Sequence, residues 1–419
     1  MRINPSVRNL VLIWMGWALT MIAFQETVGM RLDLQRPDRA LSWTAGETAA
    51  GSQDDQPYLI DPFMNQHVSW DSEFYLSVAV AGYDDPEVRG ISTNTTPFAF
   101  RPMGCQPGLD GDCVSLSYAF FPLYPVATRL VALPLHPLQL TPIARATLAA
   151  IIVSLLGTLG AMLGLYFMSR ESLGEAGGVR AAFYMLIFPS GFFLTQVYAD
   201  GLFIGLIFGT LAFLLARKWG WAALLSALAV WTRPGGAIIA LPLAIVWLMD
   251  RPWQDGWKSA LMRGLAALAP ILSHSIWTLT PLADKFQFVE DRFFGRGLLV
   301  LSRSLDSWQQ ALLAISSGNT QAKFYYTLEF GAIALAILAC LLLLRERPEI
   351  SLFGLAMVLF AVTSGPFQGM IRYVLAAPPL FWILARWGKN PAFDRVWSVV
   401  SILLLGMEAM LFSFDLWVA

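Results

Sequence analysis

Apolar runs fill most of the sequence, and polar residues gather in short segments between them. Several runs reach the roughly 20 residues that a helix needs to cross a ~30 Å hydrocarbon core. The pattern predicts an all-α, polytopic membrane protein that forms one domain over residues 1–419. We expect eleven spans, at residues 7–24, 143–168, 181–197, 201–216, 219–231, 235–249, 260–280, 325–344, 350–363, 372–385 and 397–412.

One further apolar run, FFPLYPVATRLVALP at residues 120–134, fits a span poorly because it holds three prolines and Arg129. If it crossed, the short basic loops further along the chain would fall outside, against the positive-inside rule. We interpret it as an interfacial or re-entrant helix. The N-terminus then lies inside and the C-terminus outside, and residues 25–142 and 281–324 form two large extracytoplasmic loops.

The amino-acid composition supports a membrane protein and limits the kinds of molecule that it could bind. The chain is 56% hydrophobic and 14% charged, with a formal net charge of -1. We expect membrane lipids among its partners and no nucleic acid. The first run lacks the small-residue cleavage site of a signal peptide, and Arg2 and Arg8 favour a cytoplasmic N-terminus. We expect a bacterial plasma membrane, or the endoplasmic reticulum membrane if the source is eukaryotic.

The three cysteines divide into two kinds. Cys340 lies within an apolar run, which is typical of a packing residue. Cys105 and Cys113 flank the turn-rich segment PGLDGD in the first large loop. They form a disulfide if this loop faces an oxidising compartment, and otherwise they are two buried thiols.

The segment HVSWDSEFYLSVAVAGY, residues 67–83, is the strongest candidate for chemistry. Trp70, Phe74, Tyr75 and Val78 repeat at helical spacing, which predicts a short amphipathic helix. A carboxylate at Asp71, on a helix along the membrane surface, could meet both a lipid-borne and a water-borne substrate. The alternative is that Asp71 only caps its helix.

Other polar residues gather at the predicted outer ends of the helices. They are Asp200 in VYADGLF, Arg233 in the hinge WTRPGG, and Arg372 with Tyr373 in GMIRYV. Short outer loops normally avoid arginine, so these two arginines suggest an anionic ligand such as phosphate. The alternatives are a contact to lipid headgroups for each arginine and a helix cap for Asp200.

His67 could orient Asp71 only if the helix extends back one turn. Glu408 lies deep in the last run and must be paired or protonated there. No cofactor is firmly predicted, although loop aspartates could hold a divalent metal or could simply be solvated. These aspartates are Asp71, Asp84, Asp85, Asp110 and Asp112. Walker-type and Rossmann-type glycine patterns are missing from the sequence, which disfavours a soluble nucleotide donor.

Several stretches, in order, resemble the PIG-V family of mannosyltransferases, which belong to the GT-C class of membrane glycosyltransferases. WDSEFYLSVAVAGY is similar to the family's WDS-x-WY-x-x-IA-x-x-GY signature, and AFFPLYP to its FFPLYP block. VYADGLF stands in the place of YTESLF, and LAVWTRPGG resembles the LTRP motif. FVEDRFFGRG is similar to AQ-x-x-WGR, and IRYVLAAPPLF to RY-x-x-x-x-P. Asp200 replaces the family's usual Glu, and the late-loop Gln and Trp are absent.

The resemblance implies a GT-C-like fold and transfer of a hexose, usually mannose, from a polyprenyl or dolichyl phosphate donor to a glycolipid or glycan acceptor. It implies that Asp71 is the catalytic base. Our hypothesis adds that Arg372, with Arg233 or Arg296, binds the donor phosphate. Substrate would also contact Trp70, Asp200 and Tyr373.

Two alternatives stay open at this stage. One is a GT-C transferase for another sugar or for a protein acceptor. The other is a secondary transporter, although carriers place their binding residues near the bilayer midplane and often show inverted repeats. This sequence shows no such repeat and has its polar residues at the predicted outer surface.

Overall fold

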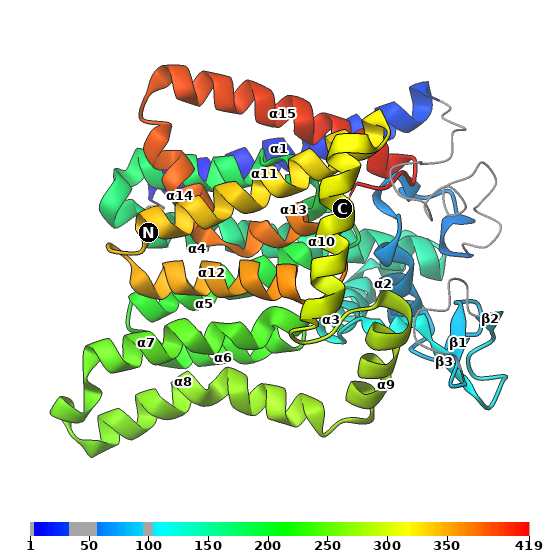
Figure 1. Cartoon of the computed structure of the whole chain (residues 1–419), viewed down its shortest axis with the longest axis horizontal. Helices are drawn as coiled ribbons and strands as arrows, with labels where there is room; N and C mark the ends of the chain where they lie inside the picture. The colour runs from blue at the N-terminus through cyan, green and yellow to red at the C-terminus, as the bar shows by residue number, and fades with distance from the viewer. Residues whose placement is uncertain (1–3, 33–56, 95–103, 419) are drawn as a thin grey trace.

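The computed structural model describes residues 4–32, 57–94 and 104–418. Most of the described chain is helical, and the longer helices run roughly side by side in one bundle (Figure 1). A layer of short elements covers one end of that bundle.

Within the described residues, four helices are long and apolar enough to cross a membrane: α1 (Pro5–Arg31), α4 (Pro142–Leu186), α11 (Thr320–Leu343) and α15 (Pro391–Ser413). Two bent pairs raise the number to six if each pair is one span. The first joins η7 (Pro189–Thr195) to α5 (Asp200–Leu215) at 99°, and the second joins α8 (Trp257–Thr278) to residues 281–294 at 84°. The protein is therefore a helical membrane protein, but the prediction of eleven spans is not confirmed.

The shorter helices explain much of this difference. α6 (Trp219–Val230), α7 (Ala240–Asp250), α12 (Pro348–Thr363) and α14 (Pro378–Trp387) have between 10 and 16 residues. At 1.5 Å per residue, such helices fall short of a ~30 Å core. The predicted span 372–385 is divided among α13 (Met370–Tyr373), η11 (Val374–Ala376) and α14, since Pro378 and Pro379 cannot continue a helix begun before them.

The two spans predicted at 143–168 and 181–197 are also different in the structure. The polar stretch between them is helical on both sides of a break at Gly174, where φ is 75° and ψ is 171°, so α4 consists of two helical segments. A Cβ atom added to Gly178 would lie 3.2 Å from the carbonyl oxygen of Tyr166, so the chain turns back on itself at this break. Helix α4 ends at Leu186, and the chain then bends through η7 into α5. A glycine takes this positive φ without strain, so the pattern alone could not separate a kink from a loop.

Helices α4 and α5 pack with their backbones in contact. A Cβ atom added to Gly157 would lie 2.4 Å from the carbonyl oxygen of Gly201, and one added to Gly205 would lie 2.3 Å from that of Gly157. Small residues at i and i+4 allow this close approach between membrane helices. The contact fixes the first turn of α5, which begins at Asp200.

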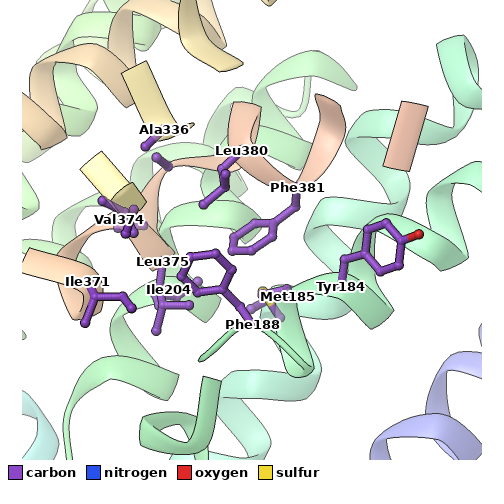
Figure 2. Packing of buried hydrophobic residues seen from close by; sticks show 14 of the residues in the cluster. Tyr184, Met185, Phe188, Ile204, Ala336, Ile371, Val374, Leu375, Leu380 and Phe381 are labelled. Carbon is purple, nitrogen blue, oxygen red and sulfur yellow. The ribbon is translucent and has the colours of Figure 1, made fainter. Parts of the chain in front are cut away.

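A buried apolar cluster holds the segment around α13 and α14 against the bundle. Phe188 at the end of α4 faces Phe381 of α14 in a T-shaped contact with ring centroids 5.8 Å apart. Ile371 and Leu375 pack into the same cluster (Figure 2). The segment that carries Arg372 is therefore fixed by packing on several helices.

The layer at one end of the bundle, here called the loop layer, contains α2 (Asp71–Val80), α3 (Leu123–Ala132), α9 (Pro281–Val289), α10 (Leu301–Ser317) and a small sheet (Figure 1). The sheet is antiparallel in the order β2 (Gly104–Cys105), β1 (Gly90–Ser92), β3 (Cys113–Ser115). It adds a minor β element to the predicted all-α fold. Helix α3, within the run 120–134, has only 10 residues and cannot cross a membrane alone.

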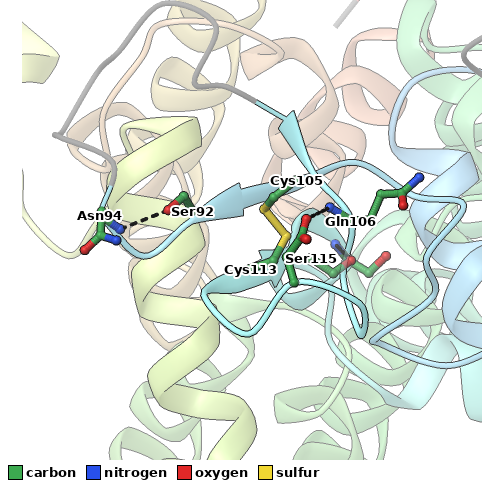
Figure 3. Close-up of a disulfide and its surroundings, with 8 residues drawn as sticks. Ser92, Asn94, Cys105, Gln106, Cys113 and Ser115 are labelled. Atoms are coloured by element: carbon green, nitrogen blue, oxygen red, sulfur yellow. Dashed lines mark hydrogen bonds between the residues drawn. A yellow bond between two sulfur atoms is a disulfide. The ribbon is translucent and has the colours of Figure 1, made fainter.

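The cysteines behave as one of the two interpretations predicted. Cys105 and Cys113 form a disulfide that links β2 to β3 across the central strand (Figure 3). Cys340 is a buried free thiol in α11. Of the two interpretations left open for Cys105 and Cys113, the structure shows the disulfide.

Candidate active site

One cavity of about 2020 Å³ lies between the loop layer and the helix bundle. The structure brings together all the site residues nominated from sequence, since each of them lines this cavity: Trp70, Asp71, Asp200, Arg233, Arg296, Arg372 and Tyr373. Pockets for one small ligand usually measure roughly 300–1,000 Å³. The cavity is therefore large enough to hold two substrates together.

Asp71 is the first residue of α2, and an unusual backbone conformation places it. The preceding residue, Trp70, has φ 55°, which is strained for a bulky side chain and costs about 1–3 kcal/mol. The Tyr198 hydroxyl accepts from the Asp71 backbone N–H at 3.2 Å and donates to the Ser69 carbonyl at 3.1 Å. The Trp70 ring packs edge-on against Trp417, with centroids 4.8 Å apart. These contacts hold the turn before α2 in its strained form.

Arg372 joins the two carboxylates of the site. Its Nη1 lies 3.0 Å from Asp71 Oδ2, and its Nε lies 4.0 Å from Asp200 Oδ2. The guanidinium carbon lies 5.1 Å from the ring centroid of Tyr198 and 5.4 Å from that of Tyr373. Burial alone would lower the pKa of Arg372, but Asp200 and Asp71 outweigh burial and raise that pKa. This guanidinium therefore stays charged at every accessible pH.

Asp200 also forms a short ion pair with Arg233. Both side chains are nearly buried, at 3% and 11% exposure, and the Arg233 guanidinium stands 4.7 Å from the Tyr373 ring centroid. The headgroup interpretation of Arg233 is therefore wrong, and so is that of Arg372, because each faces a carboxylate inside the protein. Asp200 is the first residue of α5, not its cap, and it bonds to arginine.

Arg296 reaches the same place from the loop layer. It follows a π-helical turn (Glu290–Phe294) and Gly295, whose φ is 65°. Its Nη2 donates to the Gln368 carbonyl at 3.2 Å, but Arg296 forms no ion pair with another described residue. Burial would raise the pKa of Tyr373, yet Arg296, Arg372 and Arg233 together lower it. Three guanidinium groups thus surround one phenol. Arg296 is the one that forms no ion pair with a described residue, although the Glu290 carboxylate is close enough to interact with it electrostatically.

Other nominated residues lie elsewhere or act differently. His67 is buried in η4 (Asn65–His67), before α2, and its Nδ1 faces Gln196 Oε1 at 3.1 Å. The hypothesis that it orients Asp71 is therefore wrong. Glu408 is buried in α15 and has no hydrogen bond to another described residue.

The loop aspartates bond to protein groups. Asp84 accepts from the Tyr118 hydroxyl at 2.9 Å and faces Lys285 Nζ at 3.7 Å. Asp85 accepts from Tyr58, and Asp110 accepts from the Gln106 backbone N–H at 2.8 Å. In the described ranges, no three His, Cys, Asp or Glu side chains gather closely enough to hold a metal ion.

Sequence reasoning missed two acidic residues near the site. Glu290 lines the cavity and lies within the motif FVEDRFFGRG. Its place in that motif was the signal that could have identified it as a site residue. Glu329 is buried in α11 and bonds to the backbone of α13. An acid within an apolar run is itself a functional signal in membrane proteins.

Comparisons with known proteins give limited information. No protein-family model and no curated protein matches the sequence. Among solved structures, ArnT from Cupriavidus metallidurans bound to undecaprenyl phosphate aligns with 86% of this chain and 75% of its own, at 13% identity and a TM-score of 0.43. An Archaeoglobus fulgidus oligosaccharyltransferase complex with Zn and sulfate aligns with 95% of this chain, at 14% identity and a TM-score of 0.45. This chain covers 53% of that enzyme, about half its length. At these scores the likeness decides neither fold nor function.

The geometry itself sets the chemistry that the cavity can support. Asp71, whose side chain is 27% exposed, faces the cavity beside the guanidinium groups. One of these, that of Arg296, forms no ion pair with a carboxylate of the described chain. Aspartate can accept a proton from a hydroxyl, and arginine can bind phosphate oxygens with two parallel hydrogen bonds. Such a site suits transfer of a group from a phosphate leaving group to a hydroxyl.

Proposed function

We propose that the protein is a GT-C-class glycosyltransferase of a bacterial plasma membrane. It transfers a hexose, mannose in the first instance, from a polyprenyl phosphate donor to a glycolipid or glycan acceptor on the extracytoplasmic face. The observation that carries the proposal is the meeting of Asp71 with Arg372, Arg233 and Arg296 in one cavity. The motifs shared with the PIG-V family supply the donor class.

The arginines suit the donor because a polyprenyl phosphate departs as an anion. Arg372 and Arg233 already face carboxylates, whereas Arg296 pairs with no carboxylate of the described chain. We assign the first contact with the phosphate to Arg296, with Arg372 beside it. Preorganised positive charge in a partly dry site stabilises the leaving group more strongly than the same charge in water.

Asp71 suits the acceptor because its carboxylate faces Arg372 and is open to the cavity. The acceptor hydroxyl gives its proton to Asp71 as its oxygen bonds to the anomeric carbon. The bond from that carbon to the phosphate oxygen breaks at the same time, and the electron pair leaves with the phosphate. Attack opposite the leaving group inverts the anomeric configuration.

Asp71→Asn tests this assignment. The amide keeps the size of the side chain but cannot take a proton, so turnover should fall at least about 100-fold, the usual lower value of a general base. Binding of the lipid donor should be kept, because the arginines are unchanged. The assay offers radiolabelled polyprenyl phosphate mannose and a membrane glycolipid extract to purified protein in lipid.

Asp84→Asn is the matched control, because Asp84 is also a loop aspartate paired with a cation but does not line the cavity. It should keep wild-type turnover. Full activity of Asp71→Asn would overturn the assignment of the base. Movement of unmodified substrate across reconstituted vesicles, with no transfer, would overturn the enzyme class.

A further inference from the structure

The helix that carries Arg372 cannot hold itself in place. Helix α13 has only 4 residues, and its N-cap is Gly369, which has φ 69° and no side chain to bond the first N–H groups. Formation of a single helical turn is unfavourable, because it fixes several backbone dihedral angles and gains few hydrogen bonds. The orientation of Arg372 therefore depends on groups outside α13.

Helix α11 supplies these groups from one face. Tyr325 Oη accepts from the Gly369 backbone N–H at 3.0 Å, and Glu329 Oε2 accepts from the Ile371 backbone N–H at 2.6 Å. The Tyr325 hydroxyl and the Glu329 carboxylate also interact electrostatically with each other. Tyr325 and Glu329 are four residues apart, so they lie one above the other on α11.

A third contact holds the same turn from the opposite direction. Ser190 Oγ in η7 donates to the Ile371 carbonyl at 2.7 Å. Both backbone polar groups of Ile371, the residue before Arg372, are therefore bonded to side chains of other elements. The result is a turn fixed on two sides, with the Arg372 guanidinium between Asp71 and Asp200.

The placement of Glu329 is costly unless it serves this turn. The side chain is 1% exposed within a helix long and apolar enough to cross a membrane, and it forms no ion pair with another described residue. Its second oxygen, Oε1, has no hydrogen-bond partner in the described chain. Burying a carboxylate in this way is unfavourable, and a neutral side chain of similar shape would fill the space.

We propose that Glu329, with Tyr325, is a positioning residue that fixes Arg372 against Asp71. It touches no substrate and acts through the backbone of α13. The proposal rests on the proposed function in one respect, that Asp71 and Arg372 form the reacting site. Loss of the Glu329 contact frees the turn between Gly365 and Gly369, both of which have positive φ, and lets Arg372 move away from the carboxylates.

The test compares Glu329→Ala and Glu329→Gln with the matched variant Glu408→Ala. Glu408 is a second buried glutamate in a membrane helix. Its carboxyl group interacts electrostatically with Glu329 but has no hydrogen bond to α13 in the described chain, so it tests the loss of a neighbouring acid without the loss of the α13 contact. Glu329→Ala should lower kcat about 10- to 100-fold, because a small misplacement of a catalytic group has an effect of this size. Glu329→Gln keeps an oxygen that can accept from Ile371 N–H, so it should recover most of kcat. Glu408→Ala should leave kcat unchanged.

A second measurement needs no substrate. Phenylglyoxal modifies accessible arginine, and mass spectrometry of peptides reports the extent at Arg372, whose side chain is only 10% exposed. Labelling of Arg372 should rise several-fold in Glu329→Ala and not in Glu408→Ala. If the wild type shows no transfer but this labelling pattern appears, the proposed function fails and the positioning role stands.

Three results would overturn the positioning role. One is that phenylglyoxal labels Arg372 to the same extent in Glu329→Ala as in the wild type. Another is an equal loss of kcat in Glu329→Gln and Glu329→Ala. The last is that Glu329→Ala and Glu408→Ala lose kcat and melting temperature to the same extent. That result would mean general damage to the fold.

Discussion

Arg372 contacts two carboxylates even without a substrate, so the three arginines of the site are not equally available to a ligand. It faces Asp71 and Asp200, while Arg233 faces Asp200. A phosphate that binds near Arg372 competes with Asp71 for the same donors. Asp71 then gives up part of its contact with Arg372, and its oxygens become free to accept a hydrogen bond from an acceptor hydroxyl.

His67 supports a prediction at the same scale, about pH and stability. Burial lowers the pKa of His67 from 6.5 to about 4. The unfolded chain therefore binds a proton at a higher pH than the folded chain does. Stability from the neutral imidazole is complete above pH 6.5 and is lost as the pH falls towards 4, up to about 3 kcal/mol over the whole window.

Unfolding in detergent, followed at several pH values between 4 and 7, measures this effect. The wild type should lose stability steeply below pH 6.5, and His67→Gln should lose less over the same interval because glutamine does not titrate. Equal slopes in the two proteins would contradict the prediction.

Single residues of the site were largely accessible from the sequence, and their partners were not. Asp71 and Arg372 each lie in a motif that can be read locally. Their ion pair joins positions 301 residues apart, and the contact between Glu329 and Ile371 joins two different helices. Both depend on packing of the whole bundle, which no local pattern encodes.

Among the elements, α4 and α5 make the closest approach and thereby place Asp200. Gly205→Val should destabilise the protein by at least about 1–3 kcal/mol, because its Cβ would meet the backbone of Gly157 and backbone cannot give way like a side chain. The shift should also displace Asp200 and lower activity. Thermal unfolding in detergent measures the stability.

Gly160→Ala is the control for this prediction. The nearest atom to a Cβ at Gly160, the Cα of Gly205, lies 3.8 Å away, which is ordinary contact. The variant should melt at or slightly above the wild-type temperature, since alanine also favours the helix. If Gly205→Val melts like Gly160→Ala, the close contact between α4 and α5 is not important for stability.

Element boundaries were predicted less well than element type. Hydropathy found the apolar runs, but it could not show how close to the break at Gly174 the two segments of α4 stay helical. It also could not distinguish a span from a short helix next to a bend, as at α5 and α14. The glycine spacing at Gly201 and Gly205 is a signal for close helix packing that was present in the sequence and was not used.

At the scale of the whole molecule, the loop layer and the opposite end of the bundle should face different compartments. The disulfide between Cys105 and Cys113 belongs to the loop layer, and disulfides persist in oxidising surroundings. The turn at Lys389, between α14 and α15, lies at the other end of the bundle (Figure 1). We expect the loop layer outside the cytoplasm and this turn inside.

Single cysteines test this orientation. Leu138→Cys, in the 3-10 helix η6 (Leu133–Leu138) that directly follows α3 of the loop layer, is 55% exposed and should react with a membrane-impermeant maleimide on intact cells. Lys389→Cys should react only after the membrane is permeabilised. The opposite pattern would place the candidate site in the cytoplasm and would contradict the proposed side of the reaction.

The ring of Trp70 against Trp417 has a consequence for how the protein is made. Membrane proteins are inserted as they are synthesised, and domains form from the N-terminal end first. Asp71 leaves the ribosome 301 residues before Arg372, and the tryptophan that supports the strained turn, Trp417, follows later still. Contacts so distant in sequence form late because a long loop must close first. The groups of the candidate site therefore meet only after the chain has been inserted at least as far as Trp417, so under the proposed function a shorter nascent chain is catalytically silent in the membrane.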